Sequence, residues 1–248
     1  MSSRTSNDDW PPPGWRRFAY RNRDRKHTYY IVGDRADDSR ASILLLHEFP
    51  GIKPELVELA NTLSGTFRVV VPSLLGRDGS PSTLGSLREI CVRREVRVFA
   101  ADGASTGAGW LRDFATAHVG RGGAYGVIGM CFTGNYALAL AVDPQVKAAV
   151  VAQPATPALP RRSLGLSPSD RASLAAAHDD LCVRGFRFRH DLLSSARKLS
   201  QAEKLLPPDR MVISTLTEPR SWCHSTLTGP NRNRDAVRYV TEFLASRL

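Results

Sequence analysis

The sequence predicts an α/β fold: a mostly parallel sheet with helices on both faces. Strand-like and helix-like segments alternate along the chain, which is the arrangement that builds such a sheet. Residues 41–47 form a continuous apolar run, typical of a strand that is buried on both faces. The 248 residues are enough for a full hydrophobic core, and we find neither a linker nor an internal repeat. We therefore expect a loosely ordered, proline-containing N-terminal arm at 1–25 and a single domain over 26–248.

The expected strands are short runs rich in apolar and β-branched residues, and several of them end at polar loops. In chain order they are residues 27–33, 41–47, 67–72, 126–128, 146–152, 181–188 and 210–216. The segment 73–105 is rich in Gly, Ser and Arg, so we interpret it as an excursion over the surface. A second excursion is expected at 153–180.

The expected helices show apolar residues at helical spacing or begin at recognisable start signals. Leu56, Leu59 and Leu63 share one face of the first helix, and Ser167 followed by Pro168 is typical of an N-cap with proline in the first turn. In chain order the helices are residues 53–64, 106–119, 132–142, a segment starting at 167, 192–206 and 234–248.

Charge and composition exclude several classes of function. The formal net charge is +10, but the basic residues are mostly arginines spread along the chain and no nucleic-acid-binding motif accompanies them. We therefore expect no nucleic acid as a partner, whereas a small anionic substrate would benefit from such a field. No apolar run is long enough to span a membrane, and the N-terminus has no apolar secretory core. The four scattered cysteines are expected to be reduced thiols in a cytoplasmic protein.

Residues 125–142 contain the pattern around which the other candidate residues are placed. A short strand runs into the turn Gly129-Met-Cys-Phe-Thr-Gly134, and a helix-forming segment follows. Strand, tight turn and helix are the context of a nucleophile elbow, which needs small residues two positions before and two after the nucleophile. Cys131 takes the nucleophile position, and the N-terminus of the following helix favours a thiolate and an oxyanion there. A buried structural cysteine is the alternative.

A thiol nucleophile needs a base, and the base needs a carboxylate that orients it. In the α/β-hydrolase arrangement the chain order is nucleophile, acid, histidine. Cys131, Asp191 and His224 follow this order, and each lies just after a predicted strand, where parallel sheets place their chemistry. Asp179 and Asp180 precede their strand and lie at the wrong end. The alternative for Asp191 is a helix N-cap, and for His224 a solvated loop residue.

These residues carry a resemblance to the dienelactone hydrolase family of α/β-hydrolases. The similar segments are LLLHEFPG with Glu48, VVVPSLLGR with Arg77, GMCFTG with Cys131, GFRFRHD with Asp191, and the pair His224-Ser225. The resemblance runs from about residue 28 to the C-terminus.

The resemblance implies a cysteine hydrolase with a Cys131–His224–Asp191 triad that cleaves a small ester or lactone through an acyl-enzyme. Glu48 would help to deprotonate the thiol, and Arg77 would face a substrate carboxylate or hold Glu48. Backbone N–H groups of Phe49 and Phe132 would form the oxyanion hole. No metal or organic cofactor is expected.

The sequence departs from the family where a second substrate-binding arginine would follow the histidine by four residues, because Thr228 is there. The substrate therefore stays open, and the sequence does not give the oligomeric state. The rival interpretations are a non-catalytic α/β-hydrolase-like protein that binds a small anionic ligand, a nucleic-acid-associated protein, and a redox-sensing thiol at Cys131.

Overall fold

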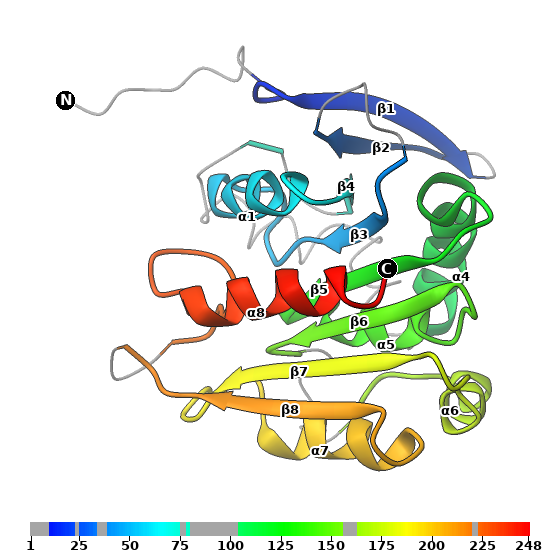
Figure 1. Cartoon of the computed structure of the whole chain (residues 1–248), viewed down its shortest axis with the longest axis vertical. Helices are drawn as coiled ribbons and strands as arrows, with labels where there is room; N and C mark the ends of the chain where they lie inside the picture. Colours follow the sequence, from blue (N-terminus) through cyan, green and yellow to red (C-terminus); the bar gives the residue numbers. More distant parts are fainter. Residues whose placement is uncertain are drawn as a thin grey trace.

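A computed structural model describes residues 10–22, 25–33, 39–74, 78–79, 104–155, 163–219 and 223–248. Its eight-stranded sheet has the order β1-β2-β4-β3-β5-β6-β7-β8 (Figure 1). The strand β2 is antiparallel to both of its neighbours, and every pair from β4 to β8 is parallel. The prediction of a mostly parallel sheet is therefore confirmed. The strands are β1 (Trp15–Asn22), β2 (Arg25–Val32), β3 (Ser42–Leu46), β4 (Arg68–Pro72), β5 (Tyr125–Met130), β6 (Val146–Ala152), β7 (Cys182–Phe188) and β8 (Met211–Leu216).

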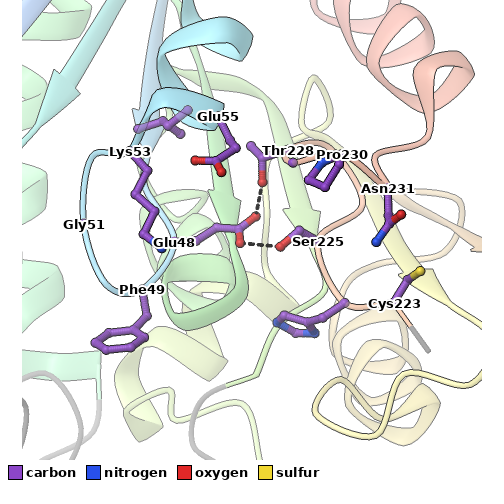
Figure 2. Close-up of a pocket in the computed structure, with 13 residues that line it drawn as sticks. Glu48, Phe49, Gly51, Lys53, Glu55, Cys223, Ser225, Thr228, Pro230 and Asn231 are labelled. Carbon is purple, nitrogen blue, oxygen red and sulfur yellow. Dashed lines mark hydrogen bonds between the residues drawn. The ribbon is translucent and has the colours of Figure 1, made fainter. Parts of the chain in front are cut away.

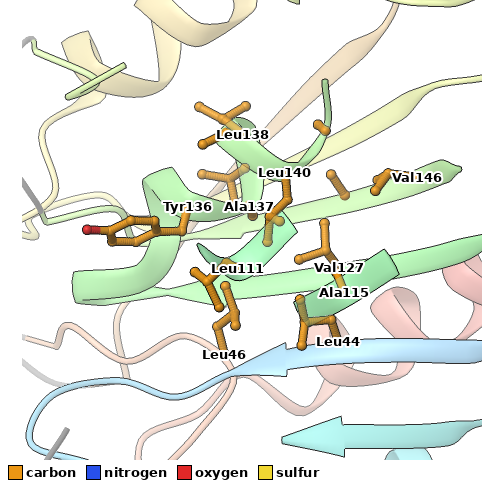
Figure 3. Close-up of a cluster of buried hydrophobic side chains, with 14 of the residues drawn as sticks. Leu44, Leu46, Leu111, Ala115, Val127, Tyr136, Ala137, Leu138, Leu140 and Val146 are labelled. Carbon is orange, nitrogen blue, oxygen red and sulfur yellow. The ribbon is translucent and has the colours of Figure 1, made fainter. Parts of the chain in front are cut away.

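Helices cover both faces of the sheet, as the alternating pattern predicts. One core lies under α1 and α8, and the other lies under α4, α5, α6 and α7 (Figures 1 and 3). Within the described residues, no helix is long and apolar enough to cross a membrane. The helices are α1 (Pro54–Ser64), α4 (Ala104–Ala115), a π-helical turn η2 (Thr116–Gly120), a 3-10 turn η3 (Cys131–Thr133), α5 (Gly134–Leu140), α6 (Pro168–Ala175), α7 (Ala196–Leu205) and α8 (Arg234–Ala245).

The central strands are apolar on both faces, which explains why 41–47 is recognisable from sequence. In β3, β4 and β5 every residue is buried. On one face α1 contributes Leu56, Leu59 and Leu63 to the core, and each such leucine stabilises the fold by roughly 1.5–3 kcal/mol. These strands form a rigid support for the loops at their ends.

The prediction of a loosely ordered arm at 1–25 was wrong for residues 15–22. They form the edge strand β1, which pairs with β2 from Trp15 opposite Val32 to Asn22 opposite Arg25. The physical reason is a period-two alternation: Phe18 and Tyr20 pack against the core, while the alternate residues Arg17 and Ala19 are exposed. The Trp15 indole also donates a 2.8 Å hydrogen bond to Asn61 of α1.

The strand order determines where a site can form. The chain passes from β3 to β4 on one side and then returns to place β5 on the other side of β3. Such a reversal opens a crevice at the C-terminal ends of the two strands. The loops that follow β3 and β5 carry Glu48 and Cys131, so both side chains lie at this switch point. Most of the predicted excursion at 73–105 lies outside the described residues.

Candidate active site

Cys131 sits at a strained turn between β5 and α5. Its φ of 51° lies in the left-handed region that residues other than glycine seldom adopt, and its side chain is only partly buried. Gly129 allows the close approach of strand and helix, because a Cβ there would collide with the Thr133 carbonyl oxygen and lie 3.0 Å from the Ala137 Cβ. The local geometry is therefore that of the predicted elbow, with the cysteine lifted out of the sheet.

The expectation of a small residue two positions after Cys131 was wrong, because that position holds Thr133. Its buried hydroxyl accepts the Met130 N–H at 3.0 Å, and its proton faces the carbonyl oxygens of Leu46 and His47 at 3.2 and 3.1 Å. The threonine thus ties the elbow to the loop after β3. Glycine follows one position later, where a Cβ on Gly134 would lie 2.8 Å from the Pro154 Cα.

Asp191 and His224 meet at the same end of the sheet. The His224 Nδ1 lies 2.7 Å from the Asp191 Oδ2, and the Asp191 side chain is fully buried. The other carboxylate oxygen accepts the backbone N–H groups of Leu193 and Ser194 at 2.9 and 3.1 Å. Helix α7 begins only at Ala196, with Ser195 as its N-cap, so Asp191 organises its own loop instead of capping that helix. With an ionised Asp191, Nδ1 carries the proton and Nε2 faces away from the acid.

The environment of His224 favours its charged form. Burial lowers the pKa of His224, but the hydrogen bond with Asp191 and the neighbouring Cys131 outweigh it and raise the pKa to about 10. Within the described residues, the buried Nε2 makes no hydrogen bond of standard geometry. Cys131 is nevertheless close enough to bias its protonation. Such loose nucleophile–base contacts are usual in the absence of substrate.

Glu48, in the loop after β3, is held by three neutral donors. Its Oε1 accepts a hydrogen bond from Thr228 at 2.7 Å and its Oε2 accepts one from Ser225 at 2.6 Å (Figure 2). Its Oε1 also accepts a hydrogen bond from Gln153 at 2.9 Å. The carboxylate therefore joins the loops that follow β3, β6 and β8. Thr228, which occupies the position of the missing arginine, uses its hydroxyl to hold Glu48.

A pocket of about 420 Å³ opens beside Glu48 and His224. Figure 2 shows it between the start of α1 and the loop before α8. Among the described residues, Cys131 is not part of its lining, so the pocket adjoins the base and Glu48 and not the thiol itself. The lining consists of Glu48, Phe49, Gly51, Lys53, Glu55, Leu56, Cys223, His224, Ser225, Thr228, Gly229, Pro230 and Asn231.

The other residues named in the sequence analysis have different outcomes in the structure. Phe49 lines this pocket and Phe132 is buried beside Cys131, so both flank the site, while their role as oxyanion donors stays a prediction. Arg77 lies outside the described residues. Asp179 and Asp180 bind Arg210 and Lys147, at the end of β7 opposite to Asp191, as the strand positions predict.

Two polar residues that support the site, and one buried lysine, were not predicted from the sequence. Gln153 is fully buried with a φ of 34°, and its side-chain oxygen accepts the Thr226 N–H at 3.2 Å. Arg187 is buried in β7 and donates to the Ser194 carbonyl at 2.9 Å and the Arg189 carbonyl at 3.0 Å, which fixes the loop of Asp191. Lys198 is buried in α7. Gln153 directly follows a strand, the signal that identified Asp191, whereas nothing in a single sequence distinguishes Arg187 from its exposed neighbours.

Within the described part of the chain, no group of three His, Cys, Asp or Glu side chains is arranged to hold a metal ion. The described cysteines, Cys131, Cys182 and Cys223, are free thiols.

A strained elbow after a central strand, with acid and histidine on later loops of a mostly parallel sheet, defines the α/β-hydrolase fold. The chain belongs to the dienelactone hydrolase family, whose model matches residues 28–172, more than half of the sequence. Family and fold together support a hydrolase. No curated protein sequence matches the chain significantly.

Solved structures show the same fold at low sequence identity. A Klebsiella pneumoniae protein described as a dienelactone hydrolase is similar with a TM-score of 0.66 and 14% identity, over 94% of this chain and 97% of that one. The thioesterase domain from the curacin biosynthetic pathway gives 0.59 and 12%, over 94% and 99%. A cold-adapted esterase from an Arctic intertidal metagenomic library gives 0.58 and 15%, over 93% and 94%.

Proposed function

We propose that this protein is a cysteine-dependent hydrolase that cleaves a small ester or lactone through an acyl-enzyme. Cys131 is the nucleophile, His224 the acid–base group and Asp191 its orienting carboxylate. The observation that carries the proposal is the buried 2.7 Å contact between Asp191 and His224. The pKa of the same His224 ring is also raised by Cys131. Asp179 and Asp180, by contrast, lie at the other end of the sheet and have no such role.

The reaction begins with the Cys131 thiolate and the His224 imidazolium. The sulfur attacks the carbonyl carbon, a C–S bond forms, and the carbonyl electron pair moves to the oxygen. In this proposal the backbone N–H groups of Phe132 and Phe49 stabilise the oxyanion; one well-placed donor is worth about 3 kcal/mol in such transition states. When the intermediate collapses, the C–O bond breaks and the leaving oxygen takes the proton from His224.

Water completes the cycle. The neutral imidazole removes a proton from water as its oxygen attacks the thioester carbonyl, and collapse of the second intermediate breaks the C–S bond. The acid is released, and the thiolate and the imidazolium are restored. Asp191 keeps the Nδ1 proton in place throughout, so that Nε2 is the atom that exchanges protons.

Glu48 has a holding role in the resting state in this proposal. Its three hydrogen bonds to Gln153, Ser225 and Thr228 support that role, because both of its oxygens are directed at those donors. Since Thr228 offers a hydroxyl where a substrate-binding arginine is expected, we include esters and thioesters among the substrates besides lactones that bear a carboxylate.

The test is the formation of an acyl-enzyme from small activated aryl esters of differing acyl groups. We expect a burst of product equal to the enzyme concentration, abolished in Cys131→Ala and strongly slowed in His224→Ala. Cys223→Ala is the matched control, because it removes a thiol adjacent to His224 and should retain the burst. If none of the esters gives a burst and wild type equals Cys131→Ala throughout, the hydrolase proposal fails and a ligand-binding protein becomes the better interpretation.

A further inference from the structure

His47 is a buried histidine in the loop after β3 that the reaction above does not use. The residue is fully buried, and both of its ring nitrogens have partners. The backbone N–H of Leu74, in the loop after β4, donates to Nε2 at 3.0 Å. Nδ1 therefore carries the proton of the neutral ring and donates it to the Glu48 carbonyl oxygen at 2.7 Å. Burial lowers the pKa of His47, which agrees with a neutral imidazole.

The hydrogen bond from His47 fixes the peptide group that joins Glu48 to Phe49. The Glu48 carbonyl oxygen also accepts the Gly51 N–H at 3.0 Å, so two donors hold it in place. This peptide bond is trans, and in a trans peptide the C=O and N–H bonds point in opposite directions. The Phe49 N–H is therefore turned away from the buried His47 ring. The hydrogen bonds among the described residues leave this N–H without a partner, so it is available as a donor.

A second contact ties the same loop to the elbow. The hydroxyl of Thr133, two residues after Cys131, lies 3.1 Å from the His47 carbonyl oxygen. Phe49 and Cys131 also pack against the same hydrophobic cluster. The backbone of His47 is therefore joined to the elbow, while its ring orients the peptide that follows Glu48.

We propose that His47 is a positioning residue that orients the Phe49 N–H as an oxyanion donor. The inference rests on the proposed function, in which this N–H stabilises the oxyanion formed when Cys131 attacks. The imidazole acts through the Glu48 carbonyl and touches no reacting atom. With only the Gly51 N–H left on that carbonyl, the peptide plane gains freedom to rotate, and a donor that rotates stabilises the transition state less well.

Two amide substitutions separate the two hydrogen bonds of the ring. In His47→Asn the side-chain nitrogen takes the place of Nδ1 and can still donate to the Glu48 carbonyl, but the shorter side chain does not reach Leu74. In His47→Gln the amide takes the place of Nε2, so its oxygen can accept the Leu74 N–H while the Glu48 carbonyl loses its side-chain donor. Each variant thus loses one buried hydrogen bond, and urea unfolding should show similar stabilities for the two.

We expect the maximal rate of acylation by an activated aryl ester to fall about 10–100-fold in His47→Gln with KM nearly unchanged, because an oxyanion donor acts in the transition state. His47→Asn should keep most of the wild-type rate, since it keeps the bond to the Glu48 carbonyl. His178→Gln is the matched control. The His178 ring also contacts a backbone carbonyl, that of Val146 at 3.1 Å, but at the N-terminal end of β6, and its loss should leave acylation unchanged.

Reaction with methyl methanethiosulfonate distinguishes a misdirected donor from general damage to the site. Here the Cys131 thiolate attacks sulfur, an S–S bond forms and methanesulfinate leaves, so no carbonyl oxygen gains charge. Mass spectrometry assigns the modification to Cys131, with Cys131→Ala as the blank. We expect the thiol of folded His47→Gln to react at the wild-type rate although its acylation is slow.

The outcomes separate this inference from the proposed function. If wild type forms an acyl-enzyme and His47→Gln acylates as fast as His47→Asn, or if the thiol reaction of His47→Gln slows as much as its acylation, the role of His47 is refuted and the hydrolase stands. If wild type forms no acyl-enzyme with any ester, the proposed function fails, and the role of His47 fails with it. If His47→Gln does not fold, His47→Ser replaces it in the same comparison, because its hydroxyl is too short to reach either partner.

Discussion

Two polar clusters meet at the same edge of the sheet, and they are built in opposite ways. In the nucleophile cluster, Asp191, His224 and Cys131 are coupled by charge, and the pKa of His224 is raised to about 10 despite its burial. In the Glu48 cluster the carboxylate accepts hydrogen bonds from three neutral donors among the described residues, Gln153, Ser225 and Thr228.

This difference indicates that the nucleophile cluster serves the chemistry and the Glu48 cluster serves the structure of the site. Charge coupling determines which group carries a proton, so the nucleophile cluster responds to pH and to the charge of a reagent. Neutral hydrogen bonds around a carboxylate determine geometry, and here they fasten three loops together. Loss of the Cys131 thiol should therefore abolish activity and leave the fold stable, whereas changes in the second cluster should weaken the fold.

The largest effect is expected from Cys131→Ala. We predict a loss of kcat/KM of at least about 10³-fold towards an activated ester, because removal of a nucleophile eliminates the covalent route. The free energy of unfolding should change by less than about 1 kcal/mol, since Cys131 is only partly buried. Ester kinetics and urea unfolding measure the two quantities. Equal losses of activity in Cys131→Ala and Cys223→Ala would assign the effect to the neighbourhood and not to the nucleophile.

Asp191→Asn is expected to have the second largest effect, about 10²–10⁴-fold on kcat, because an amide facing Nδ1 favours the wrong tautomer of the ring. The oxygen of the introduced amide can still accept the N–H groups of Leu193 and Ser194, so the loop should keep its shape. Asp180→Asn, on the exposed ion pair with Lys147 at the other end of β7, is the control. Titration of His224 by NMR should show a lower pKa in Asp191→Asn; an unchanged pKa would contradict the coupling.

The contrast also explains how much could be predicted from sequence. Asp191 was separable from Asp179 and Asp180 because parallel strands all end at one edge, so position relative to a strand decides which aspartate can reach His224. Buried strands such as β3 were recognisable because a short, uninterrupted apolar run bounded by polar turns is typical of a strand covered on both faces.

The parts that escaped prediction depend on contacts between distant segments. The hydroxyl of Thr133 replaces a small residue because carbonyl groups from the loop after β3 surround it. Gln153 has no motif, and its role appears only when Glu48 and Thr226 are placed on either side of it. In β1, the alternation of Phe18 with arginines was masked by the polar and proline-rich composition of the N-terminal segment, and pairing with β2 decides the structure there.

Glu48→Gln tests the second cluster. We predict a loss of about 1–3 kcal/mol in the free energy of unfolding, because the NH₂ of the introduced amide must face at least one donor whose hydrogen bond the carboxylate now accepts. The effect on kcat/KM should be smaller than that of Asp191→Asn, about tenfold. Glu55→Gln, in the same pocket but exposed, is the control and should change neither quantity measurably. A variant as stable as wild type but as inactive as Cys131→Ala would show that Glu48 acts on the thiol directly.

The prediction with the smallest consequence for activity concerns the dependence of stability on pH. The pKa of His224 is about 10 in the folded state and near 6.5 in the unfolded chain. The contribution of His224 to the free energy of unfolding is therefore complete below pH 6.5 and is lost as the pH rises through 10. Between these two pH values the folded protein binds a proton that the unfolded chain does not bind. Lys198 has the opposite sign: its folded pKa of about 8 lies below the unfolded value of about 10.4, so the fold gains stability between these values.

The two contributions can be separated by the free energy of unfolding at pH 7 and pH 10. His224→Gln should lose less stability over this interval than wild type, since the group that releases its proton is gone. Lys198→Met should lose more, because the compensating gain is removed. Glu48→Gln should follow the wild-type slope, because it removes neither of these two groups. A wild-type slope in His224→Gln would mean that the imidazole carries no charge in the folded protein, and the charge-coupled cluster would then be of the same neutral kind as the Glu48 cluster.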